Sequence, residues 1–332
     1  MSSVLTDPWR LPTPCLLGLV SLCVPPLGVG CGAPAAGPLD AGGEADQASS
    51  PDAAAAPDLA PMPPTVFVNH LYAVLDAETA AALPGATWLA DTFAGATMKT
   101  TSGGGKTWTG FYLFGRDTYL ELFTPGGVAG PAGECAMGFG VETPGGVDDL
   151  ASREADAGRD FFVGDQTYST GGGNSIPWFH LGSHFGKVPV HLTEWVMEYR
   201  PEYMAYALGD PGHDPADLKR RSALSKFYRP DHLLENVGAV TFLVAPAEVD
   251  GFAAVAAAYG WPVRKEGAMT IAEGPDFTLR MLADASHRGL SELTLRLARA
   301  AAMPMELPVG HSTLVVGAGT EAVWRFTPID VP

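Results

Sequence analysis

Runs of strand length, separated by Gly, Pro and Asp, recur in a fixed order along most of this chain. A β-branched and aromatic run from Val66 is followed by good helix formers, with Asp76 as a plausible helix cap, and then by three further strand-length runs. The same order begins again at Cys135 and a third time at Val237. The sequence therefore predicts an α+β fold built of repeated βαβββ units.

Residues 1–31 have the composition of an export signal rather than of a domain. The apolar run from Leu11 to Val29 is interrupted by four prolines, which is too broken for a spanning helix and suits a secretory signal. The run ends in LGVGC, a pattern that resembles the lipobox of bacterial lipoproteins. We expect Cys31 to be lipidated and to anchor an exported protein at the bacterial cell envelope, on the outer membrane or the periplasmic face. Simple secretion is the alternative.

Residues 32–64 consist mainly of Ala, Pro, Gly, Asp and Ser and contain no aromatic side chain. Such a segment cannot bury enough apolar surface to offset its ordering entropy, so we expect a disordered tether. The rest of the chain is rich enough in Val, Leu, Phe, Tyr and Trp to form one large core or two adjoining ones. We expect paired βαβββ units over residues 65–230. A third related unit over residues 231–332 belongs to the same body or forms a domain of its own.

The charge balance argues against one class of partner. The chain has 37 Asp and Glu against 20 Lys and Arg, a net charge of −17. Nucleic acid binding depends on clustered Lys and Arg, so we expect no nucleic acid partner, and membrane contact through the lipid anchor alone. Outside the signal, Cys31 and Cys135 are the only cysteines, so lipidation of Cys31 leaves no internal disulfide.

Two strand-length runs carry an ionisable side chain among apolar neighbours. VFVNHLYAVLD contains His70, and TWTGFYLFGRDTYLELF contains Glu121. An ionisable side chain on a buried strand is costly unless it is paired. These two residues are therefore the first candidates for a functional site.

Repeated βαβββ units with His in the first strand and Glu in the last resemble the vicinal oxygen chelate superfamily, which includes glyoxalases and extradiol dioxygenases. NHLYAVLD and GRDTYLELF resemble its first and fourth strands, and together with WVMEYRPEY they are similar to an uncharacterised family of exported bacterial glyoxalase-like lipoproteins. The resemblance implies a cleft formed by two units. On its floor a divalent Zn, Mn, Ni or Fe ion would be held by residues from the first and last strand of each unit.

Carried over to this chain, the resemblance places His70 and Glu121 at the metal-facing positions of the first unit. Glu198 takes the corresponding Glu position of the second unit, with Glu194 as a less favoured alternative. Met137 stands where the second unit would supply another ligand, and a thioether is a poor partner for these metals. Three protein ligands and one open position are the usual plan of a catalytic metal site, in which Glu121 or Glu198 would also move a proton. His70 and Glu121 can equally pair without a metal.

Aromatic residues of the same strands are the expected contacts of a ligand in this cleft. Tyr112, Trp195 and Arg200 are the candidate substrate-binding residues, because alternate residues of a strand face the same side. The sequence predicts capture of a small oxygen-rich molecule, with metal-dependent lyase, isomerase or oxygenase chemistry. The alternative is a non-catalytic lipoprotein that binds a ligand or a protein and retains a degenerate metal site.

Overall fold

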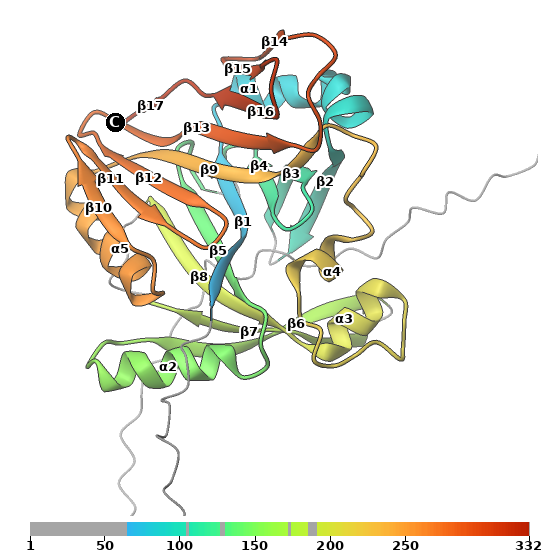
Figure 1. The fold of residues 1–332 in the computed structure, drawn as a ribbon, viewed down its shortest axis with the longest axis vertical. Helices are drawn as coiled ribbons and strands as arrows, with labels where there is room; N and C mark the ends of the chain where they lie inside the picture. Colours follow the sequence, from blue (N-terminus) through green and yellow to red (C-terminus); the bar gives the residue numbers. More distant parts are fainter. Residues whose placement is uncertain (1–64, 104–105, 127–129, 172–173, 185–190, 332) are drawn as a thin grey trace, which may run out of the picture.

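The computed structural model describes residues 65–103, 106–126, 130–171, 174–184 and 191–331 of the chain. The predicted export signal, the lipidation residue Cys31 and the predicted tether lie outside the described residues. The described part consists of two mixed β-sheets with short helices packed around them (Figure 1). Among the described residues, no helix is both long enough and apolar enough to cross a membrane.

The first sheet has eight strands and consists of two halves with one pattern. Its order is β2-β3-β4-β1-β5-β8-β7-β6, with β1 parallel to β4, β5 parallel to β8, and β1 antiparallel to β5. The strands are β1 (Val66–Val74), β2 (Gly95–Gly103), β3 (Lys106–Phe114), β4 (Tyr119–Phe123), β5 (Cys135–Val141), β6 (Phe162–Gly171), β7 (Asn174–Ser183) and β8 (Leu192–Tyr199). The predicted α+β class with repeated units is confirmed.

The second sheet repeats the same strand order, β10-β11-β12-β9-β13-β16-β15-β14. Its strands are β9 (Leu234–Val244), β10 (Val263–Glu266), β11 (Met269–Glu273), β12 (Thr278–Ala283), β13 (His287–Leu297), β14 (Met305–Val309), β15 (Ser312–Val316) and β16 (Glu321–Arg325), and the short β17 (Ile329–Asp330) pairs with β13. Helix α5 (Pro246–Ala258) follows β9, whereas β13 to β16 follow one another without a helix in this fully described stretch. The sequence predicts one unit here because the second strand set lacks the helix that marks a new unit.

Short helices cover both faces of the first sheet. Helix α1 (Ala77–Ala82) begins after Asp76, whose carboxylate accepts hydrogen bonds from the backbone N–H groups of Glu78 and Thr79, as a helix cap does. It leads into a 3₁₀ turn (Leu83–Gly85) and a π-helical turn (Leu89–Phe93). The remaining helices are α2 (Gly146–Asp156), α3 (Pro201–Leu208) and α4 (Arg220–Leu224). Both α2 and α3 contact β7 near one end of the sheet (Figure 1).

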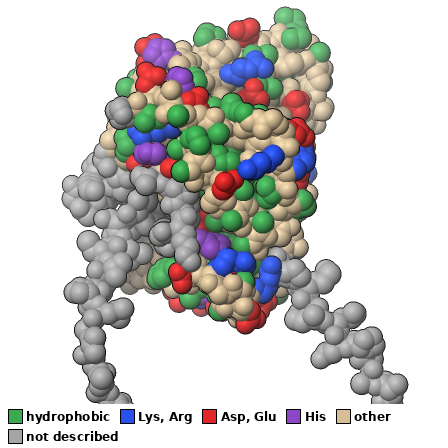
Figure 2. All heavy atoms as spheres, turned by 90° about the vertical axis from the view of Figure 1, so that its left-hand side faces the viewer, with side chains coloured by type: hydrophobic (Ala, Val, Ile, Leu, Met, Phe, Trp, Pro, Cys, Tyr) green, Lys and Arg blue, Asp and Glu red, His purple; other side chains and the backbone are tan. Residues whose placement is uncertain are grey.

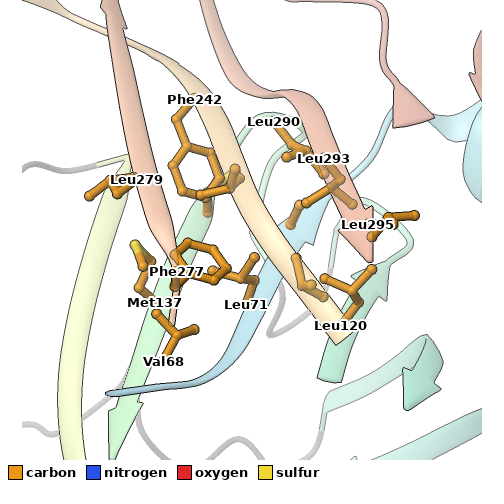
Figure 3. Packing of buried hydrophobic residues seen from close by; sticks show 14 of the residues in the cluster. Val68, Leu71, Leu120, Met137, Phe242, Phe277, Leu279, Leu290, Leu293 and Leu295 are labelled. Carbon is orange, nitrogen blue, oxygen red and sulfur yellow. The ribbon is translucent and has the colours of Figure 1, made fainter. Parts of the chain in front are cut away.

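The main core lies between the two sheets. Leu71 of β1 faces Phe242 of β9 and Leu293 of β13, and all three are buried (Figure 3). Trp261 lies between α5 and β10, next to the second sheet. Its indole N–H donates a hydrogen bond of 2.9 Å to the carbonyl of Val66 in β1 of the first sheet. Burial of apolar surface between the sheets is the dominant stabilising contribution, so the two sheets form one body.

The opposite side of the first sheet carries a second buried cluster, which we call the aromatic face. Its members include Tyr72 of β1, Tyr112 of β3, Tyr119 of β4 and Trp195 of β8. Helices α3 and α4 cover this face, and Met204 of α3 is fully buried against it. The second sheet packs on the other side, so only short helices and loops close the aromatic face.

Charges of both signs are mixed on the molecular surface seen in Figure 2. On that face Lys and Arg side chains lie among acidic, His and apolar ones instead of gathering into one region. Part of the face is behind residues that the structure does not describe.

Candidate functional site

An irregularity in β1 brings His70 to the aromatic face. Val68 points into the core between the sheets, and strict alternation would send residue 70 the same way. The pairing of β1 with β5 shifts register between Val68 and His70, so a bulge turns the imidazole to the other side. In the parallel pair of β1 and β4, His70 lies opposite Tyr119, two residues before Glu121. His70 and Glu121 therefore share one face of adjacent strands, as the sequence predicts.

The imidazole of His70 is closed in by its neighbours. It is 3% exposed, stacks on Tyr119 with ring centroids 4.6 Å apart, and meets the edge of Trp195 at 5.1 Å. Its Nδ1 lies 2.9 Å from Oδ1 of Asn69. A Cβ built on Gly138 of β5 would come within 2.3 Å of the ring, so only glycine fits there. Burial lowers the pKa of His70 to about 3, which keeps the imidazole neutral.

Glu121 is a carboxyl group buried without a full set of partners. Its side chain is 1% exposed, and Oε1 has no hydrogen-bond partner among the described residues. Burial raises the pKa of Glu121 to about 8, against smaller lowering contributions from the Tyr119 hydroxyl and the Lys99 ammonium. At neutral pH most of this carboxyl is protonated, so it can both donate and accept a hydrogen bond.

Glu121 lines a cavity of about 320 Å³ on the aromatic face. The other lining residues are Thr97, Met98, Lys99, Tyr112, Phe114, Tyr119, Tyr168, Trp178, Tyr199, Tyr203, Ala223, Leu224 and Phe227. Met98 of the edge strand β2 is 42% exposed, whereas Glu121 is almost fully buried. The cavity therefore has its rim at β2 and its only carboxyl group at the floor.

Glu198 does not join His70 and Glu121, and that part of the sequence prediction is wrong. Its carboxylate accepts hydrogen bonds from the backbone N–H groups of Gly145 and Val147, at 3.0 and 3.2 Å, where α2 begins. Helix α2 packs on the side of the sheet opposite the aromatic face. The match of Glu198 to Glu121 is one residue out of register, and a shift of one residue reverses the face of a strand.

The alternative residue Glu194 lies on the same side as Glu198. It accepts a hydrogen bond of 2.8 Å from the backbone N–H of His184 and one of 2.5 Å from the hydroxyl of Tyr259. Both partners are buried, and Tyr259 belongs to the core between the sheets. Glu194 therefore ties β8 to the structure behind the sheet and has no access to the cavity.

On the aromatic face the second unit supplies no metal-binding side chain at the matching positions. Gly138 of β5 lies opposite Trp195 of β8, and Gly140 lies opposite Met197. Met137, predicted to stand in a ligand's place, points into the core between the sheets instead. Glycine and aromatic residues therefore stand on the aromatic face where the thioether of Met137 was expected.

The three predicted substrate contacts have different positions. Tyr112 lines the cavity. Trp195 packs its edge against His70, beside the cavity rather than in its wall. Arg200 lies behind the sheet, where its Nη2 is 2.6 Å from Oδ1 of Asp165 and its Nη1 is 4.0 Å from Oε1 of Glu198. Of the three, only Tyr112 is placed to touch a ligand in the cavity.

The sequence profile of a family of unknown function, DUF5829, matches residues 68–326. The chain belongs to this family. No curated protein matches the chain.

Several solved structures are similar to this DUF5829 member in fold. A hypothetical protein from Staphylococcus aureus has 8% identity and a TM-score of 0.48, covering 74% of this chain and 96% of that one. The 2,2′,3-trihydroxybiphenyl 1,2-dioxygenase from Sphingomonas wittichii has 13% identity and a TM-score of 0.40, with 80% and 92% covered. The Mn(II)-bound glyoxalase from Novosphingobium aromaticivorans has 11% identity and a TM-score of 0.36, with 80% and 83% covered.

The residues of this DUF5829 member do not fit the divalent metal that its resemblance to glyoxalases and dioxygenases implies. Of the predicted ligands, His70 and Glu121 share a face and Glu198 lies behind the sheet. Within the described residues, no group of three or more His, Cys, Asp or Glu side chains is arranged to hold a metal ion. Two protein ligands fall short of the three that a catalytic site commonly uses.

The residues of α3, of α4 and of the segment after α4 that line the cavity were not predicted from the sequence. Tyr203 comes from α3, Ala223 and Leu224 from α4, and Phe227 from the segment after it. Phe227 stacks on Phe114 of β3 with ring centroids 4.7 Å apart. Short helices outside the repeated unit carry these side chains, and neither strand alternation nor unit alignment points to them.

Proposed function

We propose that this protein binds a small organic molecule in the cavity on the aromatic face, with Glu121 as its main polar contact and without a resident metal. One observation carries the proposal. Glu121 is almost fully buried, its Oε1 has no hydrogen-bond partner in the described part of the chain, and its side chain lines an aromatic cavity of about 320 Å³.

The state of Glu121 is costly for folding, which supports a role in binding. A buried carboxyl group without a complete set of hydrogen bonds destabilises a protein by about 1–3 kcal/mol or more. The structural carboxylates behind the same sheet are fully engaged, since Glu198 accepts two backbone hydrogen bonds and Glu194 accepts several. The cavity volume also lies at the small end of the range for ligand sites. A bound molecule would supply the missing partner.

Substitution at the cavity wall tests this proposal. Ala223 lines the cavity from α4 and is buried, so Ala223→Phe places a ring in the empty space. Ala216 is exposed and outside the cavity lining, so Ala216→Phe is the matched control. A small-molecule library is screened against the full chain by thermal shift and native mass spectrometry. Hits should bind the wild type and the Ala216→Phe protein but not Ala223→Phe. Hits that bind all three equally, or no hits at all, would contradict the proposal.

Metal analysis tests the second part of the proposal. The full chain is purified in the presence of Zn, Mn, Ni and Fe salts, and its metal content is measured against that of His70→Ala. We expect no stoichiometric metal that depends on His70. A metal present at one equivalent and lost on His70→Ala would instead support the lyase, isomerase or oxygenase chemistry that the superfamily resemblance implies.

We also propose that the protein is held at the bacterial envelope by lipid on Cys31. The support is the sequence alone, namely the apolar run that ends in LGVGC and the Ala- and Pro-rich segment after it. Membrane fractionation and fatty-acid labelling of the wild type and Cys31→Ser test this proposal. Label and membrane association should both be lost in the variant, and a variant that keeps both would contradict it.

A further inference from the structure

The wall of the cavity is unusually aromatic. Eight of its fourteen lining residues are Tyr, Phe or Trp. They come from β3, β4, β6, β7, β8, α3 and the segment after α4, so they surround the space from several sides. An aromatic ring carries partial negative charge on its faces, and several rings around one cavity create a site that attracts cations.

The tyrosines of this wall are neutral, so their hydroxyl groups add no negative charge to the cavity. Burial raises the pKa of Tyr112 and that of Tyr119 well above the ordinary value, with a smaller contribution from the nearby charge of Glu121. Tyr199 on the neighbouring half of the sheet is shifted in the same direction, to about 12, also by burial. The only acidic side chain in the wall is Glu121.

A carboxyl group at the floor of an aromatic cavity favours a positively charged ligand. An anion would meet both the carboxyl oxygens and the negative ring faces, and a purely apolar molecule would leave Oε1 of Glu121 unpaired. A cation satisfies both features, because its charge favours the ionised carboxylate form of Glu121 and it lies against the rings. Lys99, the one basic residue among the lining residues, belongs to the edge strand β2, and its ammonium lowers the pKa of Glu121, which favours the carboxylate form that a cation would meet.

We infer that the ligand of this cavity is a small organic cation of the substituted ammonium class, held by the carboxylate of Glu121 and by the aromatic wall, with Tyr112 and Trp178 among its contacts. The inference rests on the proposed function and names the ligand class of the same site. Trp178 is 7% exposed, and its indole N–H has no hydrogen-bond acceptor among the described residues. That N–H can therefore donate a hydrogen bond to an oxygen atom that the ligand carries beside its cationic group.

The test uses two probes that differ only in charge. Choline and 3,3-dimethylbutan-1-ol have nearly the same shape and the same hydroxyl group, but a quaternary nitrogen in one replaces a carbon atom in the other. Binding of each to the full chain is measured by NMR titration. We expect choline to bind at least about 10-fold more tightly than the neutral alcohol, since cation–π and carboxylate contacts act on choline alone.

Two variants show which residue causes the preference for choline over the neutral alcohol. Glu121→Gln keeps the shape of the side chain but cannot ionise when a cation binds, so it should abolish most of the preference for choline. Glu202→Gln on the exposed surface of α3 is the matched control and should leave the preference unchanged. Equal or tighter binding of the neutral alcohol, a preference that survives in Glu121→Gln, or no choline binding at millimolar concentration would each overturn the cation assignment. If library hits are still blocked by Ala223→Phe, the cavity remains the binding site and only its ligand class is wrong.

Discussion

At the scale of single residues, two neighbouring ionisable side chains are both held in their neutral forms. Burial lowers the pKa of His70 to about 3 and raises that of Glu121 to about 8. The two changes have one cause, the transfer of a charged form out of water, and opposite signs because one group is a base and the other an acid. Near neutral pH the pair therefore adds little charge to the aromatic face of the protein without a ligand.

The raised pKa of Glu121 predicts a dependence of stability on pH. An unfolded Glu titrates near 4.5 and the folded one near 8, so between these values the folded protein holds a proton that the unfolded chain has lost. The stability contributed by this proton is fully present below pH 4.5 and is lost as pH rises through 8. As pH rises from 5 to 9, the free energy of unfolding of the wild type should therefore fall by about 2–4 kcal/mol relative to that of Glu121→Gln, as measured by urea unfolding. Parallel pH profiles for the two proteins would show that the carboxyl is not buried in this way.

Gly138 offers a second test at this scale. A Cβ at this position would meet the ring of His70 at 2.3 Å, so Gly138→Ala should displace the imidazole and destabilise the protein by about 1–3 kcal/mol. Gly85 has no atom within 4 Å of a Cβ built on it, so Gly85→Ala is the matched control and should be near neutral. Denaturant unfolding of both variants checks this, and equal effects would mean that His70 does not pack against β5.

At the scale of secondary-structure elements, face and register decide which residues meet. Alternation places Glu121 correctly, but the bulge before His70 and the register of β8 cannot be read from apolar patterns alone. Residues 192–199 are nearly all buried, so both faces of β8 look alike in the sequence. For this reason the sequence predicts Glu198 at the cavity. In the structure its partners are instead the backbone N–H groups at the start of α2. The helices that close the cavity belong to no repeated unit and were missed for that reason.

Glu198 should act on stability and not on ligand binding. Its carboxylate accepts the N–H groups of Gly145 and Val147, and loss of two charge-assisted hydrogen bonds should cost about 2–4 kcal/mol in Glu198→Ala. Glu202→Ala, on an exposed residue, should cost much less. Unfolding by urea and binding of a cavity ligand are measured on both variants. If a folded Glu198→Ala protein lost ligand binding, Glu198 would belong to the binding site after all.

At the scale of the whole molecule, the second sheet supports the site without touching it. The first sheet buries one side against the second sheet and keeps the other for the cavity. The repeated order of strands and helices along the chain could be predicted because Gly, Pro and Asp bound its strand-length runs. The packing of the two sheets could not be predicted, since their shared core brings together residues far apart in the chain, such as Leu71 and Phe242.

Because the two sheets share this core, we predict that the first sheet does not fold without the second. A chain ending at residue 230 would expose Leu71 and the other apolar side chains that now face the second sheet, and would lose the hydrogen bond from Trp261 to Val66. Such a fragment should lack cooperative unfolding and should bind the dye ANS, as expected of a state without fixed packing. A fragment that unfolds cooperatively and still binds a cavity ligand would show that residues 231–332 are a separate domain.

The central claim is that Glu121 and the aromatic wall, and no metal ion, hold a small molecule on this face of the sheet. A crystal structure of the protein with a bound hit, recorded with anomalous scattering, tests it most directly. We expect ligand density against Glu121, Tyr112 and Trp178, and no anomalous peak beside His70. A metal ion bound by His70 and Glu121, or a ligand outside the cavity, would contradict it.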